Sequence, residues 1–185
     1  MKYIYFFFGL LFLIACDKKT TQGDLCEGVV CKNGGVCQNG DCQCPPNYTG
    51  PACQEEVPPI RMIANQGVTL STFPKTDPNG GGWDVFDAGD IFFVLKKGTE
   101  IVYESTYIED LQTSYTWSNA KFIFDFPKDI YTLQVWDYDD GLSGDDFVGG
   151  ITFQPYQNGL KFPETLDIQC NNCVVSFKMK VSYQH

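Results

Sequence analysis

The sequence predicts a mainly-β protein in which a small disulfide-rich module precedes an antiparallel β-sandwich of seven or eight strands. Two observations lead to this prediction. Six cysteines lie between Cys26 and Cys53, in a stretch too short to bury a core of its own. From Ile60 onward apolar and polar residues alternate with period two, and no segment shows the period of an amphipathic helix.

Composition excludes several function classes. The 185 residues include 13 Lys and Arg against 23 Asp and Glu, and the net charge of -10 argues against a nucleic-acid partner. The single histidine, His185, rules out catalytic or metal sites built from several histidines. Nine cysteines indicate an oxidising compartment, and the odd number implies that one cysteine has a separate role.

The first residues are typical of a secretory signal. Met1-Lys2 provides a positive start, and the run from Tyr3 to Ala15 contains no charged residue. As a helix this run would span about 20 Å, which is shorter than the roughly 30 Å hydrocarbon core of a bilayer. Segment 1–15 is therefore predicted to be a signal peptide and not a permanent membrane span.

The signal ends in Leu13-Ile14-Ala15-Cys16, followed by polar residues. This tetrapeptide resembles the lipobox of bacterial lipoproteins, which implies a lipidated Cys16 at the start of a polar tether, 16–25. Lipid anchoring would place the protein in the bacterial cell envelope, at the outer membrane and exposed on its surface. The alternative is an ordinary signal peptide with a spare thiol.

The six clustered cysteines are separated by 4, 5, 4, 1 and 8 residues, with Gly and Asn in the gaps. This spacing resembles an EGF-like domain of the compact tenascin type over residues 26–53. The resemblance implies a first-to-third, second-to-fourth, fifth-to-sixth pairing, although six cysteines allow fifteen pairings. The implied bridges are Cys26–Cys37, Cys31–Cys42 and Cys44–Cys53. The module would serve as a rigid spacer or as a protein-binding unit.

A short, stiff linker, 54–59, leads into the larger domain, 60–185. Its last strand is the clearest, because Val175, Phe177, Met179, Val181 and Tyr183 alternate with polar residues. Turns rich in Gly, Asp and Asn separate the other expected strands, which suggests an antiparallel eight-stranded sandwich. Those strands are Met62–Leu70, Ile91–Lys96, Ile101–Tyr107, Phe122–Phe126, Tyr131–Val135 and Ile151–Phe153.

Cys170-Asn171-Asn172-Cys173 precedes the last strand. Two asparagines can occupy the positive-φ positions of a two-residue hairpin turn, which would place Cys170 opposite Cys173 within disulfide range. A redox-active Cys-x-x-Cys would instead require the N-terminus of a helix. The pair is therefore predicted to be a structural disulfide.

Acidic residues concentrate in two segments that contain no Lys or Arg. Crowded carboxylates repel one another unless a cation neutralises them. Oxygen ligands without sulfur or imidazole suit a hard cation, and calcium, which accepts six to eight oxygens in flexible geometry, fits better than magnesium. The first segment holds Asp84, Asp87 and Asp90, and the second holds Asp137, Asp139, Asp140, Asp145 and Asp146.

The spacing of these acids resembles the C-two domain, the calcium-dependent lipid-binding β-sandwich of protein kinase C and synaptotagmins. The first segment has two Asp six residues apart before a strand, and the second has Asp-x-Asp after a strand. The resemblance covers about 60–185, and the fifth ligand is ambiguous, because counting from Asp137 selects Asp145 and counting back from Gly149 selects Asp146. The implied ligands are Asp84, Asp90, Asp137, Asp139 and one of Asp145 or Asp146.

In that family, apolar residues beside the ions contact membranes. Val85, Phe86 and Leu142 hold the corresponding positions, or they pack against neighbouring tryptophans. The leading hypothesis is an envelope-anchored, non-enzymatic lipoprotein that uses calcium to bind an anionic lipid, a glycan or a protein. The alternatives are a carbohydrate-binding sandwich with structural calcium, in which an exposed Trp83, Trp117 or Trp136 would stack on sugars, and solvated Asp-rich turns without an ion.

Overall fold

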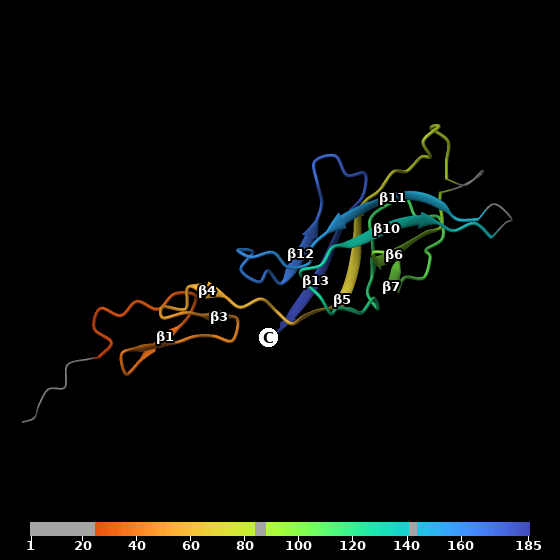
Figure 1. Ribbon diagram of the computed structural model, residues 1–185. Coiled ribbons are helices and arrows are strands. Elements are labelled where there is room, and N and C mark those ends of the chain that lie inside the picture. The colour runs from red at the N-terminus through yellow and green to blue at the C-terminus, as the bar shows by residue number, and fades with distance from the viewer. Residues whose placement is uncertain (1–24, 84–87, 141–143) are drawn as a thin grey trace, which may run out of the picture.

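The computed structural model of the chain describes residues 25–83, 88–140 and 144–185. Within these ranges every regular element is a β-strand, and no helix is long and apolar enough to cross a membrane. Figure 1 shows a small module next to a larger two-layered sandwich. The predicted mainly-β class is confirmed.

The small module consists of two short antiparallel pairs stapled by disulfides. Asn39 and Gly40 both have positive φ, 54° and 94°, as a tight two-residue hairpin turn requires, and they join the first pair. The three bridges implied by the EGF-like spacing are present: Cys26–Cys37, Cys31–Cys42 and Cys44–Cys53. The strands are β1 (Val36–Gln38), β2 (Asp41–Gln43), β3 (Tyr48–Thr49) and β4 (Glu55–Glu56).

The sandwich contains one sheet in the order β11-β10-β6-β7 and a second in the order β12-β13-β5-β8. Strand β8 pairs with residues 68–70 of β5, and strand β9 pairs with residues 62–64 of the same strand. Together β8 and β9 therefore act as one interrupted edge strand. The predicted antiparallel sandwich is therefore confirmed, with nine strands where eight were expected, because one edge position is divided between β8 and β9. The strands are β5 (Arg61–Thr72), β6 (Ile91–Lys97), β7 (Glu100–Glu104), β8 (Tyr115–Trp117), β9 (Phe122–Phe124), β10 (Tyr131–Asp137), β11 (Asp146–Phe153), β12 (Thr165–Ile168) and β13 (Ser176–Gln184).

The core lies between the two sheets and follows the period-two pattern. In β13 the buried residues are Phe177, Met179 and Val181, and polar residues between them are exposed. Phe93 of β6 lies across the layers, 5.0 Å from Trp117 and 6.0 Å from Phe177 between ring centroids. The alternation read from the sequence thus identifies the inner face correctly.

Several boundaries differ from the prediction. β7 ends at Glu104 and not at Tyr107, β9 ends before Phe126, and β11 begins at Asp146 and not at Ile151. Strands β8 and β12 were not expected. Three or four residues are too few to establish a period, so cross-strand pairing decides whether such segments are strands.

The Cys170–Cys173 disulfide is present, with 5.2 Å between the Cα atoms. The expected positive φ at the two asparagines is wrong, because neither is among the residues with positive φ. The amide of Cys173 donates to the carbonyl of Cys170 in an ordinary turn. The turn lies within a longer connection between β12 and β13, which does not need the twist of a two-residue hairpin.

The predicted linker is not a free connection. Glu55 and Glu56 form β4, which pairs with β3 and makes them part of the small module. The Glu56 carboxylate accepts hydrogen bonds from the Tyr156 hydroxyl at 3.0 Å and from the Gly159 amide at 2.7 Å. Both donors belong to the connection after β11, so the linker carboxylate is bonded to the sandwich.

We expect this junction to weaken at high pH. Burial, together with the hydrogen bond to Glu56, raises the pKa of Tyr156 to about 12, and burial raises the pKa of Tyr183 to about 12. Because both folded-state values exceed the ordinary value of 10.0, the stabilising effect is complete below pH 10 and disappears as pH rises through 12. The melting temperature should fall by about 5 °C across this window. The double substitution Tyr156→Phe/Tyr183→Phe should flatten the fall, and an equally steep decline would contradict the assignment.

Candidate cation site at one end of the sandwich

Three segments of the chain converge at one end of the sandwich. β6 and β10 are antiparallel neighbours, with Asp137 paired to Ile91, so the start of β6 and the end of β10 lie together. The segment after β7 joins them, because Ile108 forms a bridge with Ile91. Sheet pairing therefore brings residues 89–91, 107–110 and 137–140 to one place.

Asp137 is the buried anchor of this end. Its residue is 0% exposed, and its Oδ1 accepts a hydrogen bond from the backbone amide of Asp90 at 2.6 Å. The amide of Tyr138 donates in turn to the carbonyl of Asp90 at 2.8 Å. This exchange fixes the two predicted ligand positions, Asp90 and Asp137, relative to each other.

Gly89 makes this arrangement sterically feasible, although it was not among the predicted site residues. A Cβ atom at Gly89 would lie 2.6 Å from Asp137 Oδ1 and 2.9 Å from Trp83 Cβ. A side chain there would displace the buried carboxylate. The sequence signal was a glycine directly before Asp90, at the start of a strand.

The side chain of Asp90 belongs to an acidic pocket of about 350 Å³. Its Oδ1 accepts a hydrogen bond from the amide of Asp110 at 3.0 Å. Five of the seven lining residues carry carboxylates, and none is basic. The lining residues are Asp90, Tyr107, Glu109, Asp110, Tyr138, Asp139 and Asp140.

The tyrosine pair and the acids at 109–110 were not predicted. Tyr107 and Tyr138 stack with 4.6 Å between ring centroids and 6° between ring planes. Tyr107 was assigned to a strand that in fact ends at Glu104. Because the chain leaves the sheet early, Glu109 and Asp110 reach the pocket, and sequence spacing contains no signal for this contact.

The crowding of negative charge affects the pKa of Asp139. Partial burial raises the pKa of its carboxyl, and the charges of Asp146, Asp145, Asp140 and Asp90 raise it further, in that order. The ionised form of Asp139 is therefore less favourable in the folded protein than in the unfolded chain. A bound cation would relieve this repulsion.

Asp145 and Asp146 both remain candidates for the ambiguous ligand. Asp146 begins β11 opposite Asp137, and of the neighbouring acids it has the largest effect on the pKa of Asp139. Asp145 Oδ1 accepts a hydrogen bond from the Asp139 amide at 3.3 Å. The charges of both acids therefore raise the pKa of Asp139, and Asp145 also contacts the Asp139 backbone directly.

The donor chemistry fits a hard cation, but the described residues do not form a complete cage. Across 25–83, 88–140 and 144–185, no three acidic, histidine or cysteine side chains are close enough together to hold a metal ion. Carboxylate oxygens are nevertheless the only charged groups that line the pocket. The predicted residues Cys16, Asp84, Val85, Phe86 and Leu142 lie outside the described residues.

The three tryptophans proposed for sugar stacking differ in environment. Trp117 is only 6% exposed and donates its Nε1 hydrogen to the Thr106 carbonyl, so the expectation that it is exposed is wrong. Trp83 donates to the Pro74 carbonyl. Trp136 lines a pocket of about 290 Å³ and meets Phe147 edge-on, with 5.1 Å between centroids.

Fold and site together define a disulfide-stapled module joined to a β-sandwich with an acidic end. Residues 26–53 match the family model of the EGF-like domain. Protein glp-1 of Caenorhabditis elegans is 54% identical over 41 residues, which is 22% of this chain and 3% of that protein. Protocadherin-like wing polarity protein stan of Drosophila melanogaster is 38% identical over 70 residues, which is 36% of this chain and 2% of that protein. The chain thus spans a small fraction of the length of these curated relatives.

The sandwich is similar to solved structures of C2 domains, the family that the aspartate spacing resembles. One C2-domain structure is 15% identical with a TM-score of 0.45, covering 68% of this chain and 97% of that chain. Human GIVD cytosolic phospholipase A2 is 14% identical with a TM-score of 0.48, and the match covers 70% of this chain and 17% of that chain. Calcium-bound C2 domains of extended synaptotagmin 2 are 19% identical with a TM-score of 0.40, and the match covers 68% of this chain and 45% of that chain. At TM-scores below 0.5 these likenesses establish no ligand for this chain.

Proposed function

We propose that the chain is an envelope-anchored, non-enzymatic lipoprotein whose acidic sandwich end binds calcium. The observation that carries the proposal is the pocket lined by five carboxylates and no basic residue, with Asp90 held in place by the Asp137 and Asp110 contacts. Such a pocket attracts a cation, and its all-oxygen donors suit calcium.

The partner would complete the calcium coordination. Calcium takes six to eight oxygens, and the described carboxylates are not gathered into a full set. Asp90 and Asp139, with Asp145 or Asp146, would supply part of the shell. Oxygens of a phosphate or carboxylate group on an anionic lipid, a glycan or a protein would supply the rest. Attachment of Cys16 to the membrane would hold the pocket at the envelope surface.

A non-enzymatic role is consistent with the chemistry of the acids. An acid/base pair needs two carboxyl groups in environments that separate their pKa values. Here burial raises the pKa of Asp139 and the charges of neighbouring carboxylates raise it further, and this crowding of like charge favours the binding of a cation. No partner base or nucleophile is needed to account for the pocket.

A carbohydrate-binding sandwich is the second candidate, and one observation favours it. Trp136 is half-buried and lines a pocket of about 290 Å³ together with Asp145, whereas Trp117 is only 6% exposed. A glycan array comparing the unmodified chain with Trp136→Ala and Asp139→Asn tests it. Binding lost only in Trp136→Ala would favour carbohydrate recognition over calcium-mediated binding.

Calcium is expected to raise the melting temperature. With extracellular-type affinities of about 0.1–1 mM, 5 mM calcium should stabilise the fold by about 1–2 kcal/mol and raise the melting temperature by about 2–8 °C. Asp139→Asn should abolish most of this rise. In chelator the same variant should melt about 1–3 °C higher than the unmodified chain, because the repelled charge is gone.

The matched control is Glu164→Gln, which removes one exposed negative charge outside the pocket. It should keep the full calcium response. Equal melting temperatures of the unmodified chain in chelator and in 5 mM calcium would overturn the calcium proposal.

A further inference from the structure

We infer that the EGF-like module is locked to the sandwich, so that both parts form one rigid unit and the module is a fixed spacer. The locked junction stands on its own contacts. Its use, to hold the cation pocket at a set distance from the N-terminal tether, rests on the proposed function. The contacts that carry the inference lie between the Glu56 strand and the connection after β11.

Glu56 belongs to both parts at once. Its backbone is in β4, where it pairs with Tyr48 of the module. Its carboxylate accepts the Tyr156 hydroxyl and the Gly159 amide of the sandwich, at 3.0 and 2.7 Å. Hydrogen bonds to a carboxylate are the stronger kind, and two donors on one carboxylate fix its direction.

The chain between the two parts has little freedom to bend. The Val57 amide donates to the Asn47 carbonyl of the module, and the Ile60 amide donates to the Gln184 carbonyl of the sandwich. Between these two bonds lie Pro58 and Pro59, whose rings fix φ. A hinge needs residues whose φ and ψ can change, and with φ fixed at both prolines this segment can bend only through its ψ angles.

An aromatic cluster covers the same junction. Phe162 meets Tyr48 of the module edge-on, at 5.7 Å between centroids, and stacks on Tyr156 at 5.5 Å. It also contacts Tyr183 at 5.3 Å and His185 at 5.2 Å. Phe162 has a φ of 53°, a left-handed backbone that a bulky residue adopts only when surrounding packing holds it.

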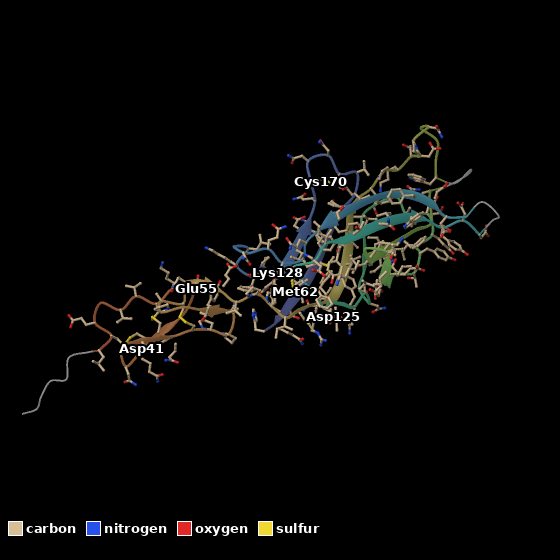
Figure 2. The ribbon with its side chains drawn as sticks, viewed as in Figure 1. Asp41, Glu55, Met62, Asp125, Lys128 and Cys170 are labelled. Carbon is tan, nitrogen blue, oxygen red and sulfur yellow. A yellow bond between two sulfur atoms is a disulfide. The ribbon has the colours of Figure 1, made fainter. Side chains whose placement is uncertain are left out.

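The locked module sits opposite the acidic end. The Tyr156 amide donates to the Pro127 carbonyl, which places the residues before β10 beside the junction. From there β10 runs its seven residues, about 20 Å, to Asp137. Figure 2 shows Met62, Asp125 and Lys128 at the end of the sandwich near the module, with Asp41 further out in the module. The pocket therefore lies at the far end of the unit.

Residual dipolar couplings of backbone amides test the lock on the full-length chain in detergent solution. One alignment tensor should fit both the module and the sandwich. Glu56→Ala should require two tensors, with the order of the module reduced at least two-fold. Glu55→Ala, a change to the neighbouring acid in the same strand, should keep one tensor and is the matched control.

Tyr156→Phe is a milder second variant, because it removes only the hydroxyl donor, and it should lower the order of the module by a smaller amount. The inference is overturned if the unmodified chain already requires two tensors, or if Glu56→Ala still fits one. Calcium titration separates this result from the proposed function. Glu56→Ala should keep the calcium-induced rise in melting temperature, and an absent rise in the unmodified chain leaves the tensor result intact.

Discussion

Replacing Asp137 by alanine is expected to lower the free energy of unfolding by about 2–4 kcal/mol, and the melting temperature by about 5–15 °C. The side chain is fully buried and accepts the Asp90 amide at 2.6 Å. Without the Asp137 side chain, the Asp90 amide loses its acceptor, and a void opens next to Gly89, where the carboxylate lay. Urea denaturation monitored by tryptophan fluorescence measures the loss.

The stability of Asp137→Ala is to be compared with that of two further variants. Asp140→Ala removes an exposed acid from the same segment and should change stability by less than about 0.5 kcal/mol. Asp137→Asn keeps an oxygen acceptor of the same shape and should fall between the two. Equal stability of Asp137→Ala and Asp140→Ala would show that Asp137 is not the anchor of this end.

Removing the Cys44–Cys53 bridge by a double serine substitution should unfold the EGF-like module while the sandwich stays folded. The loss is expected to be about 2–5 kcal/mol, typical for a native disulfide of a small module. Cys53 is 0% exposed, so the substitution also buries a hydroxyl in its place. Amide hydrogen exchange of β1 to β4 should lose its protection, whereas that of β5 to β13 should keep it.

The disulfide of the sandwich, Cys170–Cys173, provides the comparison. Serine at Cys170 and Cys173 should cost about 2 kcal/mol or less, because that bridge closes a much shorter loop. Its effect on exchange should be confined to the connection between β12 and β13. Loss of protection throughout the sandwich in the Cys44/Cys53 variant would mean that the two parts fold as one cooperative unit.

Local sequence information predicted the features that depend on short-range chemistry. Cysteine spacing led to the EGF-like pairing, and all three bridges are present. Alternation along Phe177, Met179 and Val181 identified the inner face of β13, because side-chain direction in a strand has period two. Aspartate spacing singled out Asp90, Asp137 and Asp139, which do lie at one end of the sandwich.

Other parts of the site could not be predicted, since they depend on contacts between distant segments. Gly89 matters because Asp137, far along the chain, occupies the space beside it. Tyr107 and Tyr138 stack because β7 ends early and the chain turns toward β10. The exposure of Trp117 was misjudged because its burial results from packing against Phe93 in the opposite sheet.

The sequence by itself determined the fold class and the concentration of acidic residues, since each is set by residue type and spacing along the chain. The cysteine pairing came from the resemblance to an EGF-like domain. Only the tertiary structure decided which acids share a pocket, and that the linker acid Glu56 bonds to the sandwich. The physical reason is that charge repulsion and hydrogen bonding act over a few ångströms in space. Sheet pairing creates that proximity between segments that are far apart in the chain.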